Sequence, residues 1–374
     1  MDGLKKILTV VMSLILSVYG LLGLTAGVSD DYTQGKYKNA ILFIGDGMSF
    51  NTVAATEAIT GTDLVMNEMP VQLKSDIDSY LIPATDSAAG GTALATGTRV
   101  WINSLSVYPF DVFSQDDMNV PVSLGELMKA NGRATGVVTT DKTSGATPSA
   151  FSSHTYSRDN EEQISADQLV NGFDLIWGGK SESINKDNAA ANGWTYINDR
   201  DEMNALKPGS RSFGQFSYDD LKNATDKNNT PSIAEMTEKA IELLSADGDG
   251  FFLMVEGACI DKFAHDNEMD GVTLSAVELD KAIKAALDFA EEDGETLVVV
   301  TADHGTGGIK YNESKNEYYF THGTHDITDV PVYVNVTDAG FTNGKEICNR
   351  NIPVQIARVL GFGEEQFPAT SLNK

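Results

Sequence analysis

The chain has 374 residues, enough for one large α/β domain or two smaller ones, and with 41% hydrophobic residues its composition is that of a globular protein. Against 27 lysine and arginine residues stand 54 aspartate and glutamate residues, so the formal net charge is -27. Such a surface argues against nucleic acid as a partner, because it repels the phosphate backbone; it fits a solubility or environmental adaptation, the binding of metal by a few of the acids, or both.

The first residues have the pattern of a signal peptide. Lysines at positions 5 and 6 precede an apolar run over residues 7–24, and small residues follow at 25–27. We expect residues 1–26 to be removed and the protein to be secreted or periplasmic, with no stable membrane insertion after cleavage. The run is also long enough to span a bilayer, so a retained anchor is the alternative.

Short apolar runs recur along the rest of the chain, without polar alternation, as is typical of strands buried on both faces of a parallel sheet. They occupy residues 41–44, 134–138, 251–255, 297–300 and 330–334. Helical patterns lie between them, at residues 121–131, 232–244 and 272–292. This order predicts a doubly wound α/β fold, with a mainly parallel central sheet flanked by helices and ligands at the carboxyl edge of the strands.

The polar stretch over residues 157–229 reads as excursions from this core that cover part of the site. One domain over residues 36–374 is the simplest assignment. The two cysteines, Cys259 and Cys348, are either separate buried thiols or a single bridge, and neither is our candidate nucleophile.

Three of the apolar runs lead directly into carboxylates or imidazoles. The first run is followed by Asp46, the third by Glu256, Asp261 and His265, and the fourth by Asp303 and His304. A capping aspartate after one strand would be ordinary, but three cases with the same polarity favour a shared ligand site. Asp261 and His265 are four residues apart, so a helical turn places both on one face. Imidazole with carboxylate is a zinc environment, whereas carboxylates with a threonine hydroxyl suit magnesium.

The segment 84–93, Ala-Thr-Asp-Ser-Ala-Ala-Gly-Gly-Thr-Ala, contains the candidate nucleophile Ser87. A strand-like run at 80–82 precedes it, and a helix of small residues follows to about Thr96. Ser87 would then lie at a helix N-terminus, where free N–H groups and the helix dipole favour an anion. Taken alone, Asp86 or Ser87 is better read as an N-cap, and only the context of the other motifs favours a nucleophile.

Four segments, in this order along the chain, resemble the signature motifs of alkaline phosphatases. They are Gly-Asp-Gly-Met at 45–48, Thr-Asp-Ser-Ala-Ala at 85–89, Met-Val-Glu-Gly-Ala-Cys-Ile-Asp-Lys at 254–262 and Ala-Asp-His at 302–304. The resemblance extends over about residues 39–334. It implies the hydrolysis of phosphate monoesters of small molecules through a phosphoserine, with release of inorganic phosphate.

The resemblance also implies a role for each matching position. Asp261, His265 and His325 would bind one Zn2+ ion, and Asp46, Asp303 and His304 would bind a second, with Ser87 as a further ligand. Mg2+ would be bound by Asp46, Thr147 and Glu256. Arg158 falls where the family keeps its phosphate-binding arginine, with Asp86 and Lys262 also on the substrate side. The implied reaction is a two-step in-line displacement, assisted by both zinc ions, in which Ser87 attacks phosphorus and the phosphoserine is then hydrolysed.

Two other histidines need separate interpretations. His322 competes with His325 for the zinc position, but the family places this histidine five residues before a Val-Pro-Val-like strand start, which His325 satisfies with Val330. His322 would then support the site from outside or be exposed. His154, between the magnesium threonine and the arginine, is expected to be structural.

The chain departs from the family pattern in three ways. Gly145 stands where the family commonly has Asp or His, two residues before the magnesium threonine, which leaves the affinity for the third metal open. Lys262 pairs with that acid in some members, so without it we expect a more direct contact with phosphate. Only twenty-two positions separate Asp303 from His325, where the family often inserts a large crown loop, so a small crown or none is expected. Family members are commonly homodimers, and a reduced crown weakens that inference here.

Two other functions stay open at this point. One is a phosphodiesterase or another phosphoryl-transfer enzyme of the same superfamily, such as a phosphomutase. The other is a secreted phosphate- or metal-binding protein without turnover, against which the serine and the full ligand set argue.

Overall fold

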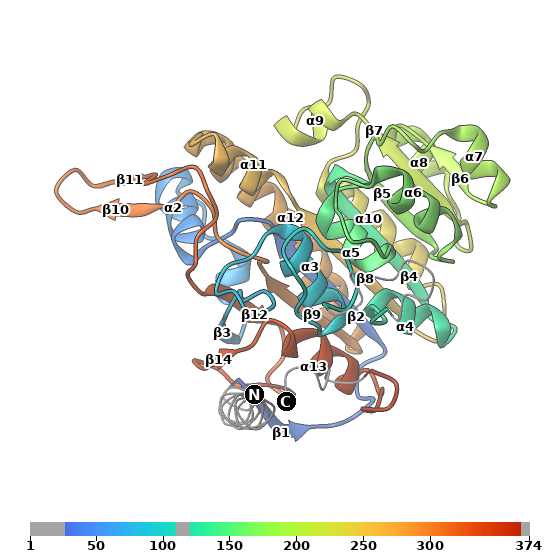
Figure 1. Cartoon of the computed structure of the whole chain (residues 1–374), viewed down its shortest axis with the longest axis horizontal. Helices are drawn as coiled ribbons and strands as arrows, with labels where there is room; N and C mark the ends of the chain where they lie inside the picture. The colour runs from blue at the N-terminus through green and yellow to red at the C-terminus, as the bar shows by residue number, and fades with distance from the viewer. Residues whose placement is uncertain (1–26, 110–119, 368–374) are drawn as a thin grey trace, which may run out of the picture.

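A ten-stranded, mainly parallel sheet forms the centre of the structure, a computed structural model that describes residues 27–109 and 120–367. Its strands lie in the order β14 (Glu346–Ile347), β3 (Val71–Ser75), β12 (Val330–Val334), β9 (Thr296–Thr301), β2 (Asn39–Gly45), β8 (Phe251–Gly257), β4 (Ala134–Lys142), β5 (Leu175–Gly179), β7 (Ser212–Phe216) and β6 (Thr195–Ile197) (Figure 1). Outside it, β1 (Val28–Tyr32) pairs with β13 (Ala339–Phe341), and β10 (Lys310–Asn312) pairs with β11 (Glu317–Tyr319).

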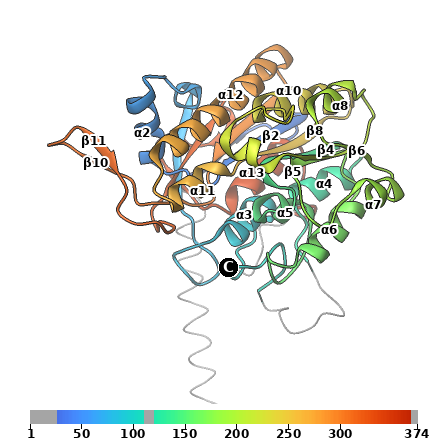
Figure 2. The same cartoon turned by 90° about the horizontal axis from the view of Figure 1, so that it is seen from above.

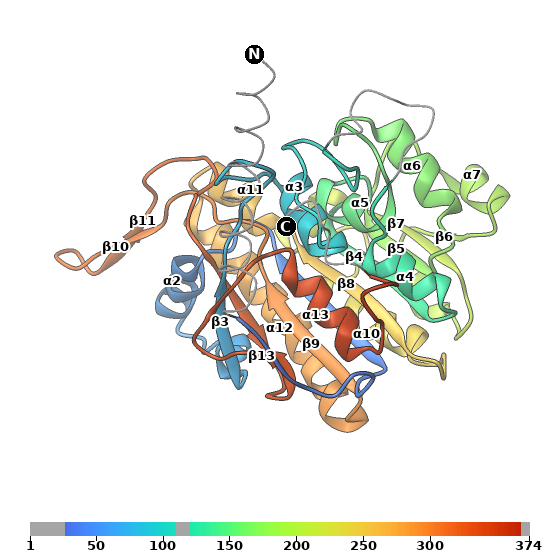
Figure 3. The ribbon, with the colours of Figure 1, turned by 60° about the horizontal axis from the view of Figure 1, so that its bottom comes forward.

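Helices cover both faces of the sheet, which confirms the predicted doubly wound α/β class (Figure 2). One face carries α2 (Phe50–Thr60), the short η1 (Val65–Glu68), α8 (Arg200–Ala205), α9 (Tyr218–Asn223), α10 (Ile233–Leu244), α11 (Cys259–His265) and α12 (Met269–Asp293). The other carries α3 (Ser87–Thr96), α4 (Leu124–Ala130), α5 (Ala146–Ser152), α6 (Glu161–Val170), α7 (Lys186–Ala191) and α13 (Asn351–Val359), with α3 and α5 side by side (Figure 3).

The central strand β2 shows why its apolar run lacks polar alternation. Ile41 and Phe43 belong to the hydrophobic cluster beneath α12, whereas Leu42 and Ile44 belong to the cluster beneath α3 and α13. Because side chains alternate between the faces of a strand, a strand covered on both sides must be apolar at every position. β2 is buried along its whole length.

Two expectations about the sheet are wrong. The run 330–334 forms β12, but it is antiparallel to both neighbours, β9 and β3. Residues 157–229 are not only excursions, because they supply β5, β7 and β6, which extend the sheet by three parallel strands. β5 and β7 are fully buried, although the sequence around them is polar.

The predicted helices form with shifted ends. The 121–131 pattern becomes α4 only from Leu124, because Ser123 and Glu126 make a capping box. The long helix ends as predicted, with Gly294 in the left-handed conformation. The prediction of a strand at residues 80–82 is wrong. Ser79 and Ile82 form an isolated bridge there, and Leu81 between them has a φ of 60°.

Two further expectations concern the termini and the thiols. Residues 1–26, where the signal peptide is expected, lie outside the described residues. Within the described ranges, the helices are too short or too polar to cross a membrane. Cys259 is buried, Cys348 is half-buried, and neither takes part in a disulfide, so the bridge does not form.

Candidate active site

Three adjacent parallel strands bring their carboxyl ends together at the site. β2 lies between β8 and β9, and Ile44 of β2 is opposite Glu256 on one side and Thr301 on the other. Asp46 follows β2, and Asp303 with His304 follows β9, so all of these groups meet at one edge of the sheet. The convergence expected from the sequence therefore exists.

Close approach at this edge depends on Gly47. Its φ is +74°, and a β-carbon there would lie 2.8 Å from Cα of Asp261. Its N–H donates to Oδ1 of Asp303 at 3.3 Å. Glycine is therefore required both by the backbone conformation and by the contact with α11.

Helix α3 presents Ser87 to the same edge. Asp86 is the N-cap and accepts from the N–H of Ala89 at 3.0 Å, so Ser87 is the first helical residue and its hydroxyl is not used for capping. Two glycines seat the helix: a β-carbon at Gly90 would lie 3.0 Å from Cβ of Asp303, and one at Gly91 would lie 3.3 Å from Cα of Thr147. The run of small residues thus lets α3 pack closely against the end of β9 and against α5.

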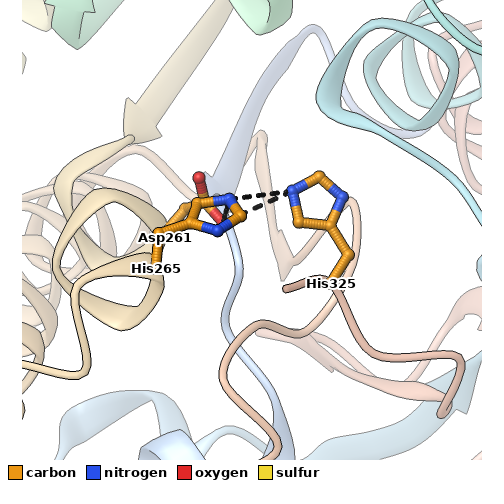
Figure 4. A group of neighbouring side chains, drawn as sticks. All are labelled: Asp261, His265 and His325. Carbon is orange, nitrogen blue, oxygen red and sulfur yellow. Dashed lines mark hydrogen bonds and ion pairs between the residues drawn. The ribbon is translucent and has the colours of Figure 1, made fainter. Parts of the chain in front are cut away.

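The first candidate metal group consists of Asp261, His265 and His325 (Figure 4). The two imidazole Nε2 atoms are 3.1 Å apart, and Oδ1 of Asp261 is 3.4 Å from Nε2 of His265 and 3.7 Å from Nε2 of His325. Zn–N and Zn–O bonds of about 2.0–2.1 Å in a tetrahedron place ligand atoms about 3.3 Å apart. The three atoms therefore have the spacing that one zinc ion requires.

The two histidine rings are held in the tautomer that a metal needs. Nδ1 of His265 lies 2.9 Å from the carbonyl oxygen of Gly323, and Nδ1 of His325 lies 3.0 Å from that of Thr85. A carbonyl can only accept, so each Nδ1 carries a proton and donates it, and the lone pair left for a metal on each ring is that of Nε2 once any proton there is lost. Both lone pairs are on the side where the rings face one another (Figure 4).

The second candidate metal group consists of Asp46, Asp303 and His304, with Ser87 beside it. Nε2 of His304 is 3.3 Å from Oδ2 of Asp303, 3.5 Å from Oδ1 of Asp46 and 3.3 Å from Oγ of Ser87. The two carboxylate oxygens are buried and make no hydrogen bond among the described residues. The other oxygen of Asp303 is already occupied by the N–H groups of Gly47 and His304. Buried, unpaired oxygens that converge on an imidazole fit a cation.

The charges of these groups require a counterion. Burial, with Asp303 and Asp261 nearby, raises the pKa of Asp46 well above its ordinary value, and burial with Asp261 raises the pKa of Asp303 to about 7. Burial lowers the pKa of His304 and of His325, which keeps both imidazoles neutral. His304 and His325 are thus neutral beside mutually repelling carboxylates, which favours a divalent cation, whereas the contact with Asp261 raises the pKa of His265 to about 9, so this ring must release a proton to bind one.

An all-oxygen set lies next to the second group. Thr147 of α5 and Glu256 of β8 are each 1% exposed. Burial, followed by the charge of Asp141, raises the pKa of Glu256 to about 8, although the hydroxyls of Thr139 and Thr147 act to lower it. Oγ of Thr147 has no partner in good hydrogen-bonding geometry within the described part of the chain. Together with Asp46, whose pKa Glu256 raises, these oxygens fit magnesium.

Arg158 is held beside the serine by the residue that caps α3. Its Nη1 lies 3.2 Å from Oδ2 of Asp86, and its backbone N–H donates to the carbonyl of Asn103. The same carboxylate accepts from the N–H of Asn103 at 3.2 Å. Burial alone would lower the pKa of Arg158, but the charges of Asp86, Asp46 and Asp141 together outweigh it and raise that pKa. Asp86 thus orients Arg158.

Lys262 does have an acidic partner, contrary to the expectation. Its Nζ lies 3.1 Å from Oδ2 of Asp141, at the end of β4, and the two side chains are 27% and 14% exposed. Burial alone would lower the pKa of Lys262, but Asp141, Tyr218 and Asp46 together outweigh it and raise that pKa. The family pattern directed the search for an acid to position 145, so Asp141, four residues earlier, was overlooked.

The remaining histidines lie outside the two groups. His322 is 41% exposed and its Nε2 is 3.3 Å from Oδ1 of Asp326. His154 makes hydrogen bonds with the carbonyl of Ser106 and with Glu126, which fits a structural role. A short hairpin, β10–β11, stands where a crown would be inserted and extends away from the sheet (Figure 1).

Sequence reasoning missed two supporting residues. Thr306 Oγ1 donates to Oδ1 of Asp261 at 2.5 Å and lies 3.3 Å from Nδ1 of His304, so it links the two metal groups. Asp141 follows the apolar run of β4 just as Asp46 follows that of β2, so the rule that identified the other carboxylates could have found it. A lone threonine in a loop carries no comparable pattern.

Comparisons with known proteins agree with this geometry. A family model described as alkaline phosphatase matches residues 37–352. Alkaline phosphatase 3 of Bacillus subtilis is 36% identical over 300 residues, which cover 74% of this chain and 62% of that protein, so the chain spans less than two thirds of that relative. The structure of alkaline phosphatase from the Antarctic bacterium TAB5 is 27% identical, with a TM-score of 0.74, and the match covers 88% of this chain and 100% of that one. A variant of that enzyme was solved with Mg bound; it is 26% identical, with a TM-score of 0.73 and the same coverage.

Proposed function

The chain belongs to the alkaline phosphatase family, and from this premise we propose that it hydrolyses phosphate monoesters of small molecules through a phosphoserine on Ser87. The observation that carries the proposal is the position of Oγ of Ser87, at the N-terminus of α3 and 3.3 Å from Nε2 of His304 in the second metal group. Arg158 stands beside it, tied to the preceding residue. A phosphate group bound here would thus meet the nucleophile, the N-terminus of a helix, which favours anions, and the guanidinium group of Arg158 together.

The proposed cofactors are two zinc ions, one in each histidine-containing group, and one magnesium ion at Asp46, Thr147 and Glu256. The ligand-atom spacings, the mixed imidazole and carboxylate donors, and the unpaired buried oxygens support this assignment. Bound there, the cations would supply Lewis-acid activation of the serine hydroxyl and of water, and would neutralise the charge of the substrate dianion.

The chain's own residues then act in a fixed order. Arg158 holds two nonbridging phosphate oxygens in its fork, while the free N–H groups at the start of α3 face the same anion. Oγ of Ser87 loses its proton and forms a bond to phosphorus, and the bond from phosphorus to the ester oxygen breaks to release an alcohol. Water then attacks the phosphoserine, which regenerates the serine hydroxyl and releases inorganic phosphate.

The test is covalent labelling of Ser87→Ala beside the wild type. With a labelled aryl phosphate and an acid quench, we expect one phosphoserine per wild-type chain and none in the variant, whose kcat should fall by several orders of magnitude. Removal of metal by a chelator should abolish both labelling and turnover, and zinc with magnesium should restore them. Labelling that persists in the variant would show that another residue is the nucleophile.

The same assay separates the alternative within the superfamily. An aryl monoester and the matching diester present the same leaving group, so their rates differ only by the second ester. A preference for the diester would contradict the proposed reaction. We further propose a secreted or periplasmic location from the pattern of residues 1–26, which N-terminal sequencing of the mature protein can test, and a homodimer, which sedimentation can test.

A further inference from the structure

In the turn between β4 and α5, the side chain of Asp141 fills the space next to Gly145. Gly145 is the N-cap residue of α5, two positions before Thr147, and its N–H donates to the carbonyl of Lys142 at 2.8 Å. A β-carbon built on Gly145 would lie 2.5 Å from Oδ2 and 2.9 Å from Cγ of Asp141. Non-bonded carbon atoms do not approach a carboxylate so closely. The carboxylate of Asp141 therefore occupies the volume that any side chain at position 145 would enter.

Asp141 is also connected to Lys262 through its side chain and to Glu256 through its backbone. Its Oδ2 lies 3.1 Å from Nζ of Lys262. Its backbone N–H donates to Oγ1 of Thr139 at 2.8 Å, and that hydroxyl donates to Oε2 of Glu256. Thr139 stands directly opposite Glu256 in the β4–β8 pairing. Two consecutive hydrogen bonds thus fix the backbone at Asp141 relative to Glu256, and the contact with Lys262 holds its carboxylate.

Lys262 follows Asp261 on α11, so its ammonium group lies close to the metal groups and needs a partner that holds it in place. An ammonium group released from Asp141 could turn toward the buried carboxylates of Glu256 and Asp46 and compete with a cation for them. A carboxylate that holds the ammonium aside keeps those oxygens available.

We propose that Asp141 is a positioning residue of the third cation site, supplying from the end of β4 the carboxylate that position 145 lacks. It holds Lys262 away from Glu256 and adds a fixed negative charge beside the cation bound by Asp46, Thr147 and Glu256. The inference rests on the proposed function, but it concerns magnesium affinity and not turnover. Gly145 is then no sign of a weak third site, because the glycine is what leaves room for Asp141.

The test removes the carboxylate from position 141 and, in one variant, restores a carboxylate at position 145. Zinc-loaded wild type, Asp141→Asn, Asp141→Ala and the double variant Asp141→Ala/Gly145→Asp are titrated with magnesium by calorimetry, and zinc content is measured in each. Residues that orient metal ligands typically contribute 10- to 100-fold to affinity. We expect both single variants to bind magnesium at least about tenfold more weakly with zinc retained, and the double variant to recover most of the affinity. Asp159→Asn, at an exposed position of a nearby loop, controls for the loss of one charge.

The outcomes separate the two proposals. Asp141 variants that bind magnesium as tightly as the wild type would overturn the inference, and so would a folded double variant whose affinity stays as low as that of Asp141→Ala. A purely structural role would lower the unfolding temperature without changing the magnesium affinity, and would overturn it too. Phosphoserine labelling in the same zinc-loaded samples tests the proposed function independently, because the labelling does not depend on whether the carboxylate is at position 141 or at position 145.

Discussion

His325 and His322 lie three residues apart, but the structure gives them different surroundings. Nε2 of His325 points at the other ligands of the first metal group, 3.1 Å from Nε2 of His265. His322 is 41% exposed and pairs with Asp326 instead. The difference arises because Thr85 accepts from Nδ1 of His325 and fixes its ring. One imidazole is therefore preorganised for a metal and the other is not.

A pair of alanine variants tests this difference. His325→Ala removes one of the three proposed ligands of the first zinc ion, so we expect the loss of about one zinc equivalent per chain and a fall in kcat/KM of at least about 100-fold. His322→Ala is the matched control and should keep both zinc ions with activity near that of the wild type. Elemental analysis after dialysis measures the zinc content. Equal zinc loss in the two variants would remove the distinction between the histidines.

Individual site residues were predictable where a motif joined them to a strand end. Asp46, Asp303 and His304 are fixed by their position after a buried strand, and Asp261 with His265 by helical spacing. The partner of Lys262 was not, because the contact depends on the turn over residues 142–145, which folds Asp141 back into the place of a side chain at 145. Sequence position alone cannot show that two positions four residues apart share one volume.

At the scale of elements, His154 joins three segments that flank the site. Its Nε2 lies 2.7 Å from Oε1 of Glu126 in the first turn of α4, and its Nδ1 lies 2.6 Å from the carbonyl of Ser106. Glu126 also closes the capping box with Ser123. The pair thus holds the start of α4 against the loop that precedes it and against the chain that leaves α5.

The pH dependence of this pair follows from its pKa shifts. Burial alone would lower the pKa of His154, but Glu126 outweighs it and raises that pKa above the ordinary 6.5; the same contact outweighs burial and lowers the pKa of Glu126 below 4.5. The contribution of His154 to stability is complete below pH 6.5 and is lost as the pH rises through its folded pKa. That of Glu126 is present above pH 4.5 and is lost at lower pH.

His154→Gln should therefore cost more stability at pH 6 than at pH 9. At pH 6 we expect a loss of about 1–3 kcal/mol, the usual range for a charged group deprived of its partner, and a smaller loss at pH 9, where less of the wild-type imidazole is charged. Urea unfolding at the two pH values measures both. Glu126→Gln should show the same trend, and a loss of equal size at both pH values would contradict the assigned charge of His154.

Whole elements were predictable where their burial is uniform. β2, β8 and β9 read as apolar runs because both faces are covered, and α12 reads as a long helix that ends at a glycine. β5 and β7 were missed because they are short and their runs contain glycine, serine and glutamine, which are buried here by the layers on either side. The direction of β12 was wrong because an apolar run carries no sign of its polarity.

At the scale of the molecule, a net charge of -27 means that acidic groups repel one another across the surface. One place where this repulsion acts is the end of α12, whose last turn contains acidic residues and no basic one. Glu291 and Glu292 are exposed there and make no ion pair among the described residues. Their charges meet both the negative end of the helix dipole and the overall negative field. Screening acts on both terms, because the Debye length falls from about 30 Å at 0.01 M salt to about 10 Å at 0.1 M.

Neutralising these two glutamates should therefore stabilise the protein, and most at low salt. For Glu291→Gln/Glu292→Gln we expect a gain of about 0.5–2 kcal/mol at 0.01 M NaCl that shrinks by at least half at 0.3 M, measured by urea unfolding at pH 7.5. Asp270→Asn, in the first turn of the same helix, removes one acid where the dipole favours it, so its gain should be smaller or negative. Wild-type stability should itself rise over the same range of salt. A gain that does not change with salt would mean that local packing, and not charge, sets the stability of this helix end.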